Sequence, residues 1–353
     1  MLKKQYAPIR FGISLSNPCN IIYHVDVNQE KCQPVTYTTE ELERYAQYIE
    51  HTLQSVNTER KTHIDIHGMN VLDSLEQLLP FVTKMKDKVD WFSIRIQERL
   101  TQNKVNGIMS LWKVLGNKLK VDIQYGFSLE ENDNINEYDS FYYNMRWLYS
   151  RGLGNCCLVS INPSNAHRIT EIFDDFLKFK KEYKDFSCTI FLSPQLQYSD
   201  SFDKDIVENA LKNISEYINE NPELGLKFSY SPDIAFRTKI ENSLISNILL
   251  EMTVDGNLYP GYNVRMLTDT GIQEFILGNI SEEFDVLDER KELLLKELEN
   301  VSELTDEEKI FRSVPWEDKD YIYNIQPSEQ MIILHNLFAT YLYDLTASYK
   351  EQL

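Results

Sequence analysis

The feature that most constrains the fold is a strand-like run followed by a helix-like run, repeated six times over about 210 residues. The strand-like runs lie at residues 11–16, 63–67, 91–97, 120–124, 156–162 and 187–193. Such alternation predicts a parallel sheet joined by right-handed helical crossovers. The first helix is predicted to begin at Thr38 or Thr39, because Glu41 follows closely, as in a capping box.

Most of these strands alternate apolar with polar residues. Ile64 and Ile66, for example, alternate with His63, Asp65 and His67. A doubly wound sheet is apolar on both faces, and a closed eight-stranded barrel fills its interior with branched apolar side chains. We therefore predict an α/β fold, a partial (β/α)6 TIM-like barrel that is open and has a polar inner face. The alternative is that these polar residues lie near strand ends and contact solvent.

The pattern changes after residue 220. A short strand is expected at 225–230, and Asp255-Gly256 predicts a tight β-hairpin turn. Residues 281–320 hold 15 acidic and 6 basic residues, which accounts for −9 of the net charge of −19. A helix at 329–349 is expected to pack on the body, with partner binding as an alternative. The predicted parts are a barrel at 1–220, a small hairpin-containing extension at 221–285 and an acidic helical tail at 286–353.

Composition limits the function classes. A hydrophobic share of 42% is that of a globular chain, and the net charge of −19 argues against unaided binding to nucleic acid or to an anionic membrane. A cationic peptide or protein partner stays open. There is no apolar run of about 18 residues, and residues 1–10 lack the apolar core of a signal peptide. The five cysteines form no CxxC pair, so a reducing, cytoplasmic location is expected.

The loop after the first strand reads Leu-Ser-Asn-Pro-Cys-Asn-Ile-Ile-Tyr-His-Val-Asp over residues 15–26. It resembles the signature loop of radical S-adenosylmethionine enzymes that modify peptides. In that family, three cysteines spaced by four and then three positions hold a [4Fe–4S] cluster. Cys19 matches the first ligand, but Tyr23 and Asp26 stand at the other two. A cluster needs suitable ligands on three irons, so the resemblance implies a degenerate cluster loop and no cofactor.

The second landmark follows the second strand. The family has a Gly-Gly-Glu-Pro-like turn here, which receives the methionine amino group of the cofactor. This chain has Gly68 and Met69. Gly68 permits the turn, but the thioether of Met69 cannot pair with an ammonium group. The resemblance therefore implies a degenerate S-adenosylmethionine turn as well.

The third landmark resembles the start of the SPASM extension of the same enzymes. That pattern is an Asp-Gly-x-x-Tyr-Pro-Cys hairpin followed by Leu-Gly-Asn-Ile. Here residues 255–261 read Asp-Gly-Asn-Leu-Tyr-Pro-Gly, and residues 277–280 read Leu-Gly-Asn-Ile. Gly261 replaces the cysteine, and no cysteine follows Cys188. An auxiliary cluster on thiolates is therefore not expected.

The resemblance spans about residues 10–285 and implies a pseudo-enzyme that kept the scaffold without the redox chemistry. Such a chain would bind a ribosomally made precursor peptide, or an active maturation enzyme, as an accessory or scaffold. The expected peptide or ligand cleft is the polar strand face: Ser14, Ser16, His67, Arg95, Gln97, Gln124 and Asn162. Arg95 would pair with a carboxylate or phosphate of the ligand, or internally with Asp65 or Asp122.

Two other classes stay open. The first is a barrel enzyme, metal-dependent or cofactor-free, that uses residues at the carboxyl ends of the strands; His24, Asp26 and His67 would then be the metal ligands. The second is nucleophilic catalysis by Cys19 beside His24. Cys156 and Cys157 are expected to be core residues instead. The sequence does not indicate an oligomeric state.

Overall fold

The computed structural model describes residues 9–15, 36–55, 61–68, 71–96, 100–125, 135–192, 201–230, 250–253, 256–259, 277–299 and 328–342. Its strands belong to one sheet of ten, in the order β10-β9-β8-β1-β2-β3-β4-β5-β6-β7. The strands are β1 (Ile9–Ser14), β2 (Thr62–His67), β3 (Trp91–Ile96), β4 (Leu119–Tyr125), β5 (Gly154–Ile161), β6 (Ser187–Leu192), β7 (Lys227–Tyr230), β8 (Leu250–Met252), β9 (Asn257–Tyr259) and β10 (Gly278–Asn279).

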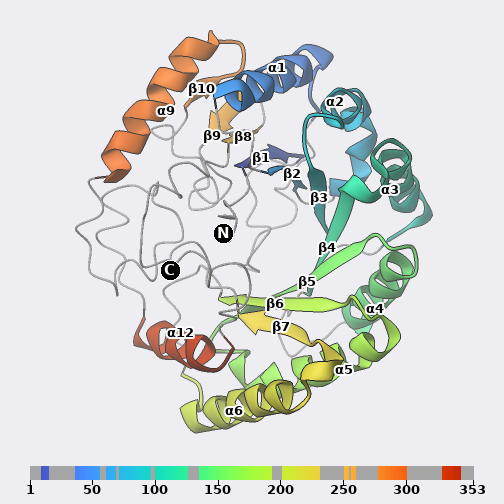
Figure 1. The fold of residues 1–353 in the computed structure, drawn as a ribbon, viewed down its shortest axis with the longest axis vertical. Coiled ribbons are helices and arrows are strands. Elements are labelled where there is room, and N and C mark those ends of the chain that lie inside the picture. The colour runs from blue at the N-terminus through green and yellow to red at the C-terminus, as the bar shows by residue number, and fades with distance from the viewer. Residues whose placement is uncertain are drawn as a thin grey trace, which may run out of the picture.

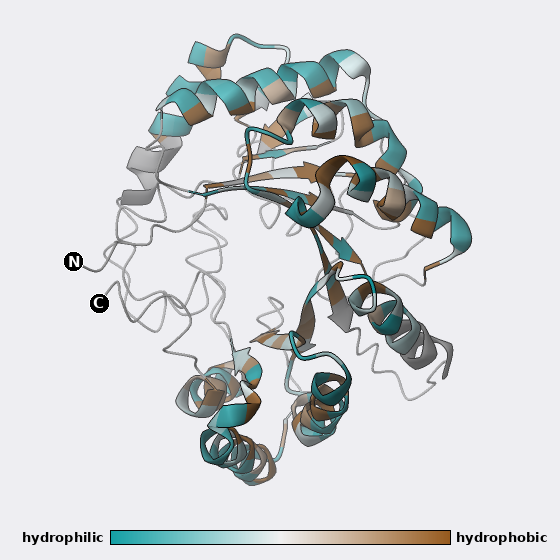
Figure 2. Ribbon diagram, turned by 45° about the vertical axis from the view of Figure 1, so that its right-hand side comes forward, coloured by the Kyte–Doolittle hydropathy of each residue, from teal (hydrophilic) through white to brown (hydrophobic). Residues whose placement is uncertain are grey.

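The helices lie along the outer, convex side of the curved sheet (Figure 1). They are α1 (Thr39–Ser55), α2 (Leu79–Met85), α3 (Gln102–Leu115), α4 (Ile135–Tyr149), α5 (Ile169–Glu182), α6 (Lys204–Glu220), α9 (Phe284–Glu299) and α12 (Glu329–Leu342). Hydrophobic residues concentrate on the strands and hydrophilic residues on the outer turns of the helices (Figure 2). The core therefore lies between the sheet and one helical layer.

The predicted α/β fold, an open barrel of strand–helix units, is confirmed. Strands β1 to β7 are parallel neighbours in chain order, and the sheet does not close on itself. The predicted hairpin is present as β8 and β9, which pair in antiparallel register. It joins the same sheet, because β8 pairs in parallel with β1. The division into three parts at residues 220 and 285 stays a prediction.

The start of α1 matches the expected capping box. The Thr38 backbone N–H donates to the Glu41 carboxylate at 2.7 Å, and the Glu41 N–H donates to the Thr38 hydroxyl at 3.1 Å. Between β2 and β3, residues 71–73 and 75–78 form 3₁₀ turns, and α2 begins only at Leu79. Pro80 in the first turn of α2 lacks a backbone N–H, and this favours a helix start at that point.

Two phenolic hydroxyls bridge β1 and β8. Tyr45 places its hydroxyl 2.6 Å from the Gly12 carbonyl oxygen and 2.8 Å from that of Leu250. Tyr37 does the same for the carbonyls of Ser14 and Met252, at 2.5 and 3.2 Å. Burial raises the pKa of Tyr45 well above its usual value, so it stays a hydrogen-bond donor.

The tail helix α12 packs on α6 and β7, as expected of a docked helix. Its buried side chains include Leu334, His335 and Phe338. No helix in the described part of the chain is long and apolar enough to cross a lipid bilayer.

Candidate functional site

The polar residues of β2, β3 and β4 share the sheet face opposite the helices. Register pairs Asp65 with Ser93 and Arg95 with Asp122. Their apolar alternates, including Ile64, Ile94 and Val121, are buried. Because paired residues on parallel strands point to the same side, these side chains lie in rows across the strands. The expected polar strand face is therefore present in these three strands.

His63, Asp65 and Ser93 form a compact group at the start of this face. The Ser93 hydroxyl lies 2.6 Å from Nε2 of His63 and donates to the Asp65 carboxylate. The same Nε2 lies 3.0 Å from Asp65 Oδ1, and the imidazole stacks on Trp91 at 4.7 Å between ring centroids.

This group does not have the geometry of a Ser-His-Asp triad. A triad uses both imidazole nitrogens, one toward the serine and the other toward the aspartate. Here Nε2 faces both partners, and the buried Nδ1 has no hydrogen-bond partner among the described residues. The contacts therefore favour a structural role for these three residues, which link β2 and β3 by hydrogen bonds.

A β-bulge in β5 places two residues opposite Asp122 on β4. The register between β4 and β5 shifts between Val121 and Ile123, so that Asn155 and Cys156 both stand opposite Asp122. Asn155 Nδ2 donates to Asp122 Oδ1 at 2.7 Å. Burial raises the pKa of Asp122, and the Asn155 hydrogen bond and the Arg95 charge partly oppose this rise.

The proximity of Arg95 to Asp122 agrees with the internal pairing weighed for Arg95 in the sequence. Burial raises the pKa of the Cys156 thiol to about 12, and this disfavours the nucleophilic thiolate. Its sulfur lies 3.3 Å from the Thr189 hydroxyl on β6. Asn155 was not among the site residues predicted from the sequence. The pattern that indicates it is a pair of consecutive polar or small residues, which breaks the alternation of the strand.

The other predicted cleft residues are only partly within the described chain. Ser14 is buried on β1, and its carbonyl accepts the Tyr37 hydroxyl. The side-chain oxygen of Asn162 accepts from the Ser164 hydroxyl and the Asn165 N–H, so it shapes the turn after β5. In the backbone, His67 is the last residue of β2 and Gln124 is the residue before the last of β4.

The residues of the predicted cluster loop, with several other predicted site residues, lie outside the described part of the chain: Ser16, Cys19, Tyr23, His24, Asp26, Met69 and Gln97. Gly68 is described and has φ of 140°, a conformation that other residues rarely adopt. Within the described ranges no three His, Cys, Asp or Glu side chains gather as a metal site. The alternative metal site of His24, Asp26 and His67 stays a prediction, because His24 and Asp26 lie outside these ranges.

By the resemblance described above, the residues of this loop would form a poor donor set for an iron–sulfur cluster. Three thiolates are the ligands that leave one iron open for a substrate. The positions that match them in this sequence carry one thiol, one phenol and one carboxylate, from Cys19, Tyr23 and Asp26. Met69 offers no carboxylate for an amino group.

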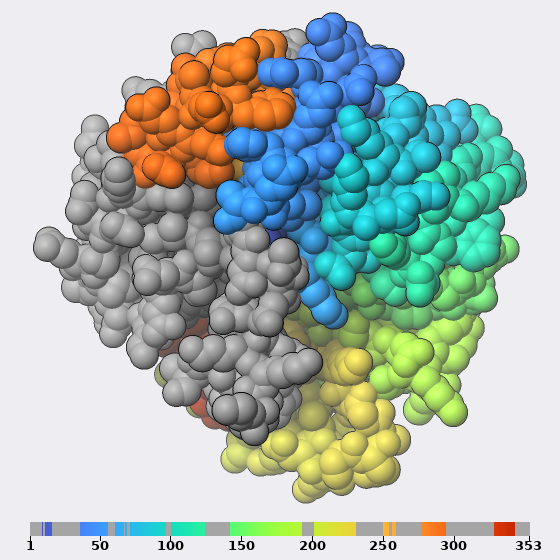
Figure 3. Space-filling model, turned by 45° about the horizontal axis from the view of Figure 1, so that its top comes forward, coloured from blue at the N-terminus to red at the C-terminus, as the bar shows by residue number. Residues whose placement is uncertain are grey.

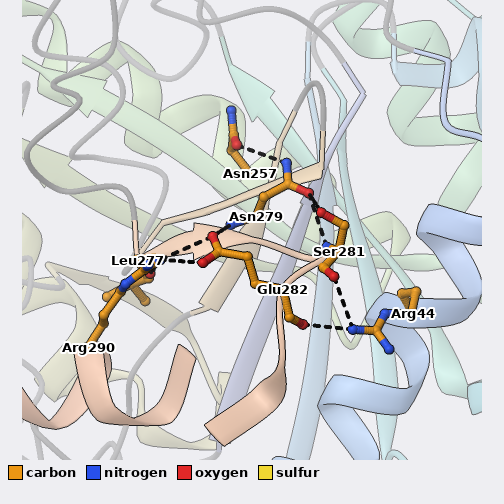
Figure 4. Close-up of polar contacts among 7 residues, drawn as sticks. All are labelled: Arg44, Asn257, Leu277, Asn279, Ser281, Glu282 and Arg290. Carbon is orange, nitrogen blue, oxygen red and sulfur yellow. Dashed lines mark hydrogen bonds and ion pairs between the residues drawn. The ribbon is translucent and has the colours of Figure 1, made fainter. Parts of the chain in front are cut away.

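The third landmark is a structural turn (Figure 4). Asn279 Nδ2 donates to Asn257 Oδ1 at 3.0 Å, which ties β10 to β9. The side-chain oxygen of the same asparagine accepts the Ser281 N–H and hydroxyl, at 3.0 and 2.7 Å. The Asn279 N–H donates to the Glu282 carboxylate at 2.7 Å. One asparagine thus holds both the strand pair and the following turn.

Two arginines fix this turn to its neighbours. Arg44 of α1 donates to the Ile280 carbonyl at 3.1 Å. It also donates to the Glu282 carbonyl at 2.7 Å, and Arg290 of α9 donates to the Leu277 carbonyl at 3.0 Å (Figure 4). Gly278 has φ of 150°, and a Cβ there would lie 2.5 Å from Leu287 and 2.6 Å from Arg290. The backbone angle and the close packing at position 278 therefore both favour glycine.

Comparisons with known proteins show the fold. No protein-family model and no curated protein matches the chain. Among solved structures, native anSMEcpe with bound AdoMet and Cp18Cys peptide has a TM-score of 0.57 at 15% identity, covering 95% of this chain and 96% of that one. Streptococcus suis SuiB bound to S-adenosylmethionine has a TM-score of 0.52 at 11% identity, covering 90% of this chain and 72% of that one. The open α/β barrel expected from the resemblance is therefore the fold of two proteins solved with S-adenosylmethionine.

Proposed function

We propose that this chain is a non-catalytic accessory protein of peptide modification. It has the fold of radical S-adenosylmethionine enzymes and holds neither the cluster nor the cofactor. It binds a ribosomally made precursor peptide, an active maturation enzyme, or both. The observation that carries the proposal is the donor set Cys19, Tyr23 and Asp26, which lacks two of the three thiolates.

Three further observations support it. One structural neighbour was solved with a peptide as well as AdoMet, so the fold accommodates a peptide in that protein. Two of the described cysteines, Cys156 and Cys188, are poor ligands, because burial raises the pKa of their thiols. The polar strand face around Arg95 and Asp122 supplies donors and acceptors of the kind that a peptide backbone requires.

Anaerobic iron–sulfur reconstitution, followed by quantitation of iron and sulfide, tests the proposal. The natural chain is expected to bind far less than one cluster per chain. A matched variant, Tyr23→Cys with Asp26→Cys, restores the three cysteines and shows whether the reconstitution works in this scaffold. A stoichiometric four-iron cluster in the natural chain would overturn the proposal, and stoichiometric zinc or manganese would favour the metal-enzyme alternative.

Peptide binding needs its own measurement. The purified chain is used to select from a displayed library of unstructured peptides, with an Arg95→Met variant as the comparison. Enriched peptides that bind the natural chain and lose affinity with the variant support a cleft on the strand face. Failure to enrich any peptide sequence would contradict the peptide-binding half of the proposal.

A further inference from the structure

Helix α9 carries an exposed apolar ridge on its outer face. Val286 is 38% exposed and Leu293 is 55% exposed, so both aliphatic side chains contact solvent. They are seven residues apart, so they lie on the same side of the helix about 10 Å from each other. Glu289 lies between them on that side. The helix forms part of the molecular surface beside α1 (Figure 3).

The opposite face of α9 fixes the helix in place. Leu287 is fully buried, and Phe284 packs on Tyr48 of α1 at 5.2 Å between ring centroids. Asp288 accepts from the Tyr48 hydroxyl at 3.1 Å and lies 2.9 Å from His51 Nε2. The outer ridge is therefore presented by an anchored helix, and little ordering cost would attend a partner that binds it.

The charges near the ridge are unbalanced. Two basic side chains in this part of α9 are already engaged: Arg290 with Glu282 at 2.9 Å, and Lys291 with Asp288 at 2.6 Å. The remaining carboxylates are exposed and form no ion pair with any other described residue: Glu283, Asp285, Glu289 and Glu292. Among the described side chains, the surface around Val286 and Leu293 is thus apolar at its centre and negative at its border.

We propose that the outer face of α9 docks a cationic amphipathic protein segment, with apolar side chains on Val286 and Leu293 and Lys or Arg beside the carboxylates. Charge complementarity selects this occupant. A second copy of the same face would bring like charges together, and anionic lipid or nucleic acid would be repelled. The surface lies on the outer side of the helical layer, so the inference does not depend on the proposed function of the strand face.

The test uses the full chain and a labelled helical peptide of about 18 residues, or about five turns, with Leu on one face and Lys on the other. Two comparison peptides separate the contributions. One replaces Lys by Glu, and the other scrambles the same Lys and Leu so that no apolar face remains. Fluorescence anisotropy is expected to show salt-sensitive binding of the first peptide only.

Protein variants locate the site. Glu289→Lys with Glu292→Lys is expected to weaken binding by about tenfold or more. The control, Glu216→Lys with Glu220→Lys on α6, changes the net charge equally and should leave the affinity within about twofold. Val286→Ser with Leu293→Ser should also weaken binding, while circular dichroism confirms that each variant is folded.

The proposal is overturned by any of three results: an equal loss in the α6 control, equal binding of the scrambled peptide, or a dimer that Leu293→Ser dissociates. The first two results would indicate attraction by overall charge alone. The third would show that a second copy of the chain occupies the face.

Discussion

The hydroxyl of Tyr230 lies 2.9 Å from Nδ1 of His335, and this contact joins the last parallel strand to the tail helix inside the core. Burial lowers the pKa of His335 to about 4. Because the folded pKa is below the ordinary value of about 6.5, the fold favours the neutral imidazole. This contribution to stability is complete above about pH 6.5 and is lost as the pH falls toward about 4.

His335→Asn is therefore expected to make stability less sensitive to pH between about 6.5 and 4. Asn keeps an acceptor near the Nδ1 position but does not titrate in this range. The difference between the two pKa values corresponds to an upper limit of about 3 kcal/mol. Urea unfolding of both proteins at several pH values measures it, and parallel pH profiles would contradict the prediction.

Gly278→Ala is expected to destabilise the chain by about 3 kcal/mol, because it combines a disfavoured φ with overlap of a buried side chain. Gly152→Ala is the matched control. Gly152 also has positive φ, at 67°, but no atom lies within 4 Å of an added Cβ. Its cost should be about 1 kcal/mol. Equal unfolding midpoints for the two variants would show that the packing of Gly278 is unimportant.

Asn155→Ala is expected to raise the pKa of Asp122 further, because it removes a hydrogen bond that favours the carboxylate. A carboxyl-carbon NMR titration follows this group directly. Asn209→Ala on the exposed face of α6 serves as the control, and it should leave the titration unchanged. An unchanged Asp122 pKa in Asn155→Ala would mean that the bulge does not stabilise the carboxylate.

Cys156 is expected to resist alkylation in the folded chain. With its pKa at about 12, the thiolate fraction near neutral pH is about a thousandfold lower than for an ordinary thiol. Timed iodoacetamide labelling with peptide mass spectrometry measures the rate, and the same reaction in urea gives the unfolded reference. A folded rate within about tenfold of the unfolded rate would contradict the predicted environment.

Local patterns in the sequence were sufficient for elements that depend on neighbours in the chain. The Thr38 capping box, the alternating strands and the hairpin of β8 and β9 each have short-range causes, and each is present. Contacts made at a distance were not predictable. The β5 bulge exists only relative to Asp122 on β4, and the attachment of β8 to β1 depends on a strand some 240 residues away.

The sequence predicted the polar strand face of the candidate site, but it did not predict the contacts that its side chains make. The alternation of polar and apolar residues predicted that Arg95 lies on a polar strand face. In the structure, Arg95 on β3 is paired in register with Asp122 on β4. The alternation could not indicate that Asn162 uses its side chain in a turn, since that depends on Ser164 and Asn165 adopting the local turn geometry. The loop residues Cys19, Tyr23 and Asp26 stay predictions.

The Tyr45 bridge has a consequence for synthesis of the chain on the ribosome. Its two carbonyl partners, at Gly12 and Leu250, are far apart in sequence, and Leu250 follows Tyr45 by 205 positions. At about 5 to 20 residues per second, β8 emerges about 10 to 40 s after the tyrosine. During that interval one edge of β1 has no strand to pair with. A nascent chain of this protein is therefore expected to depend on chaperones until its last quarter has been made.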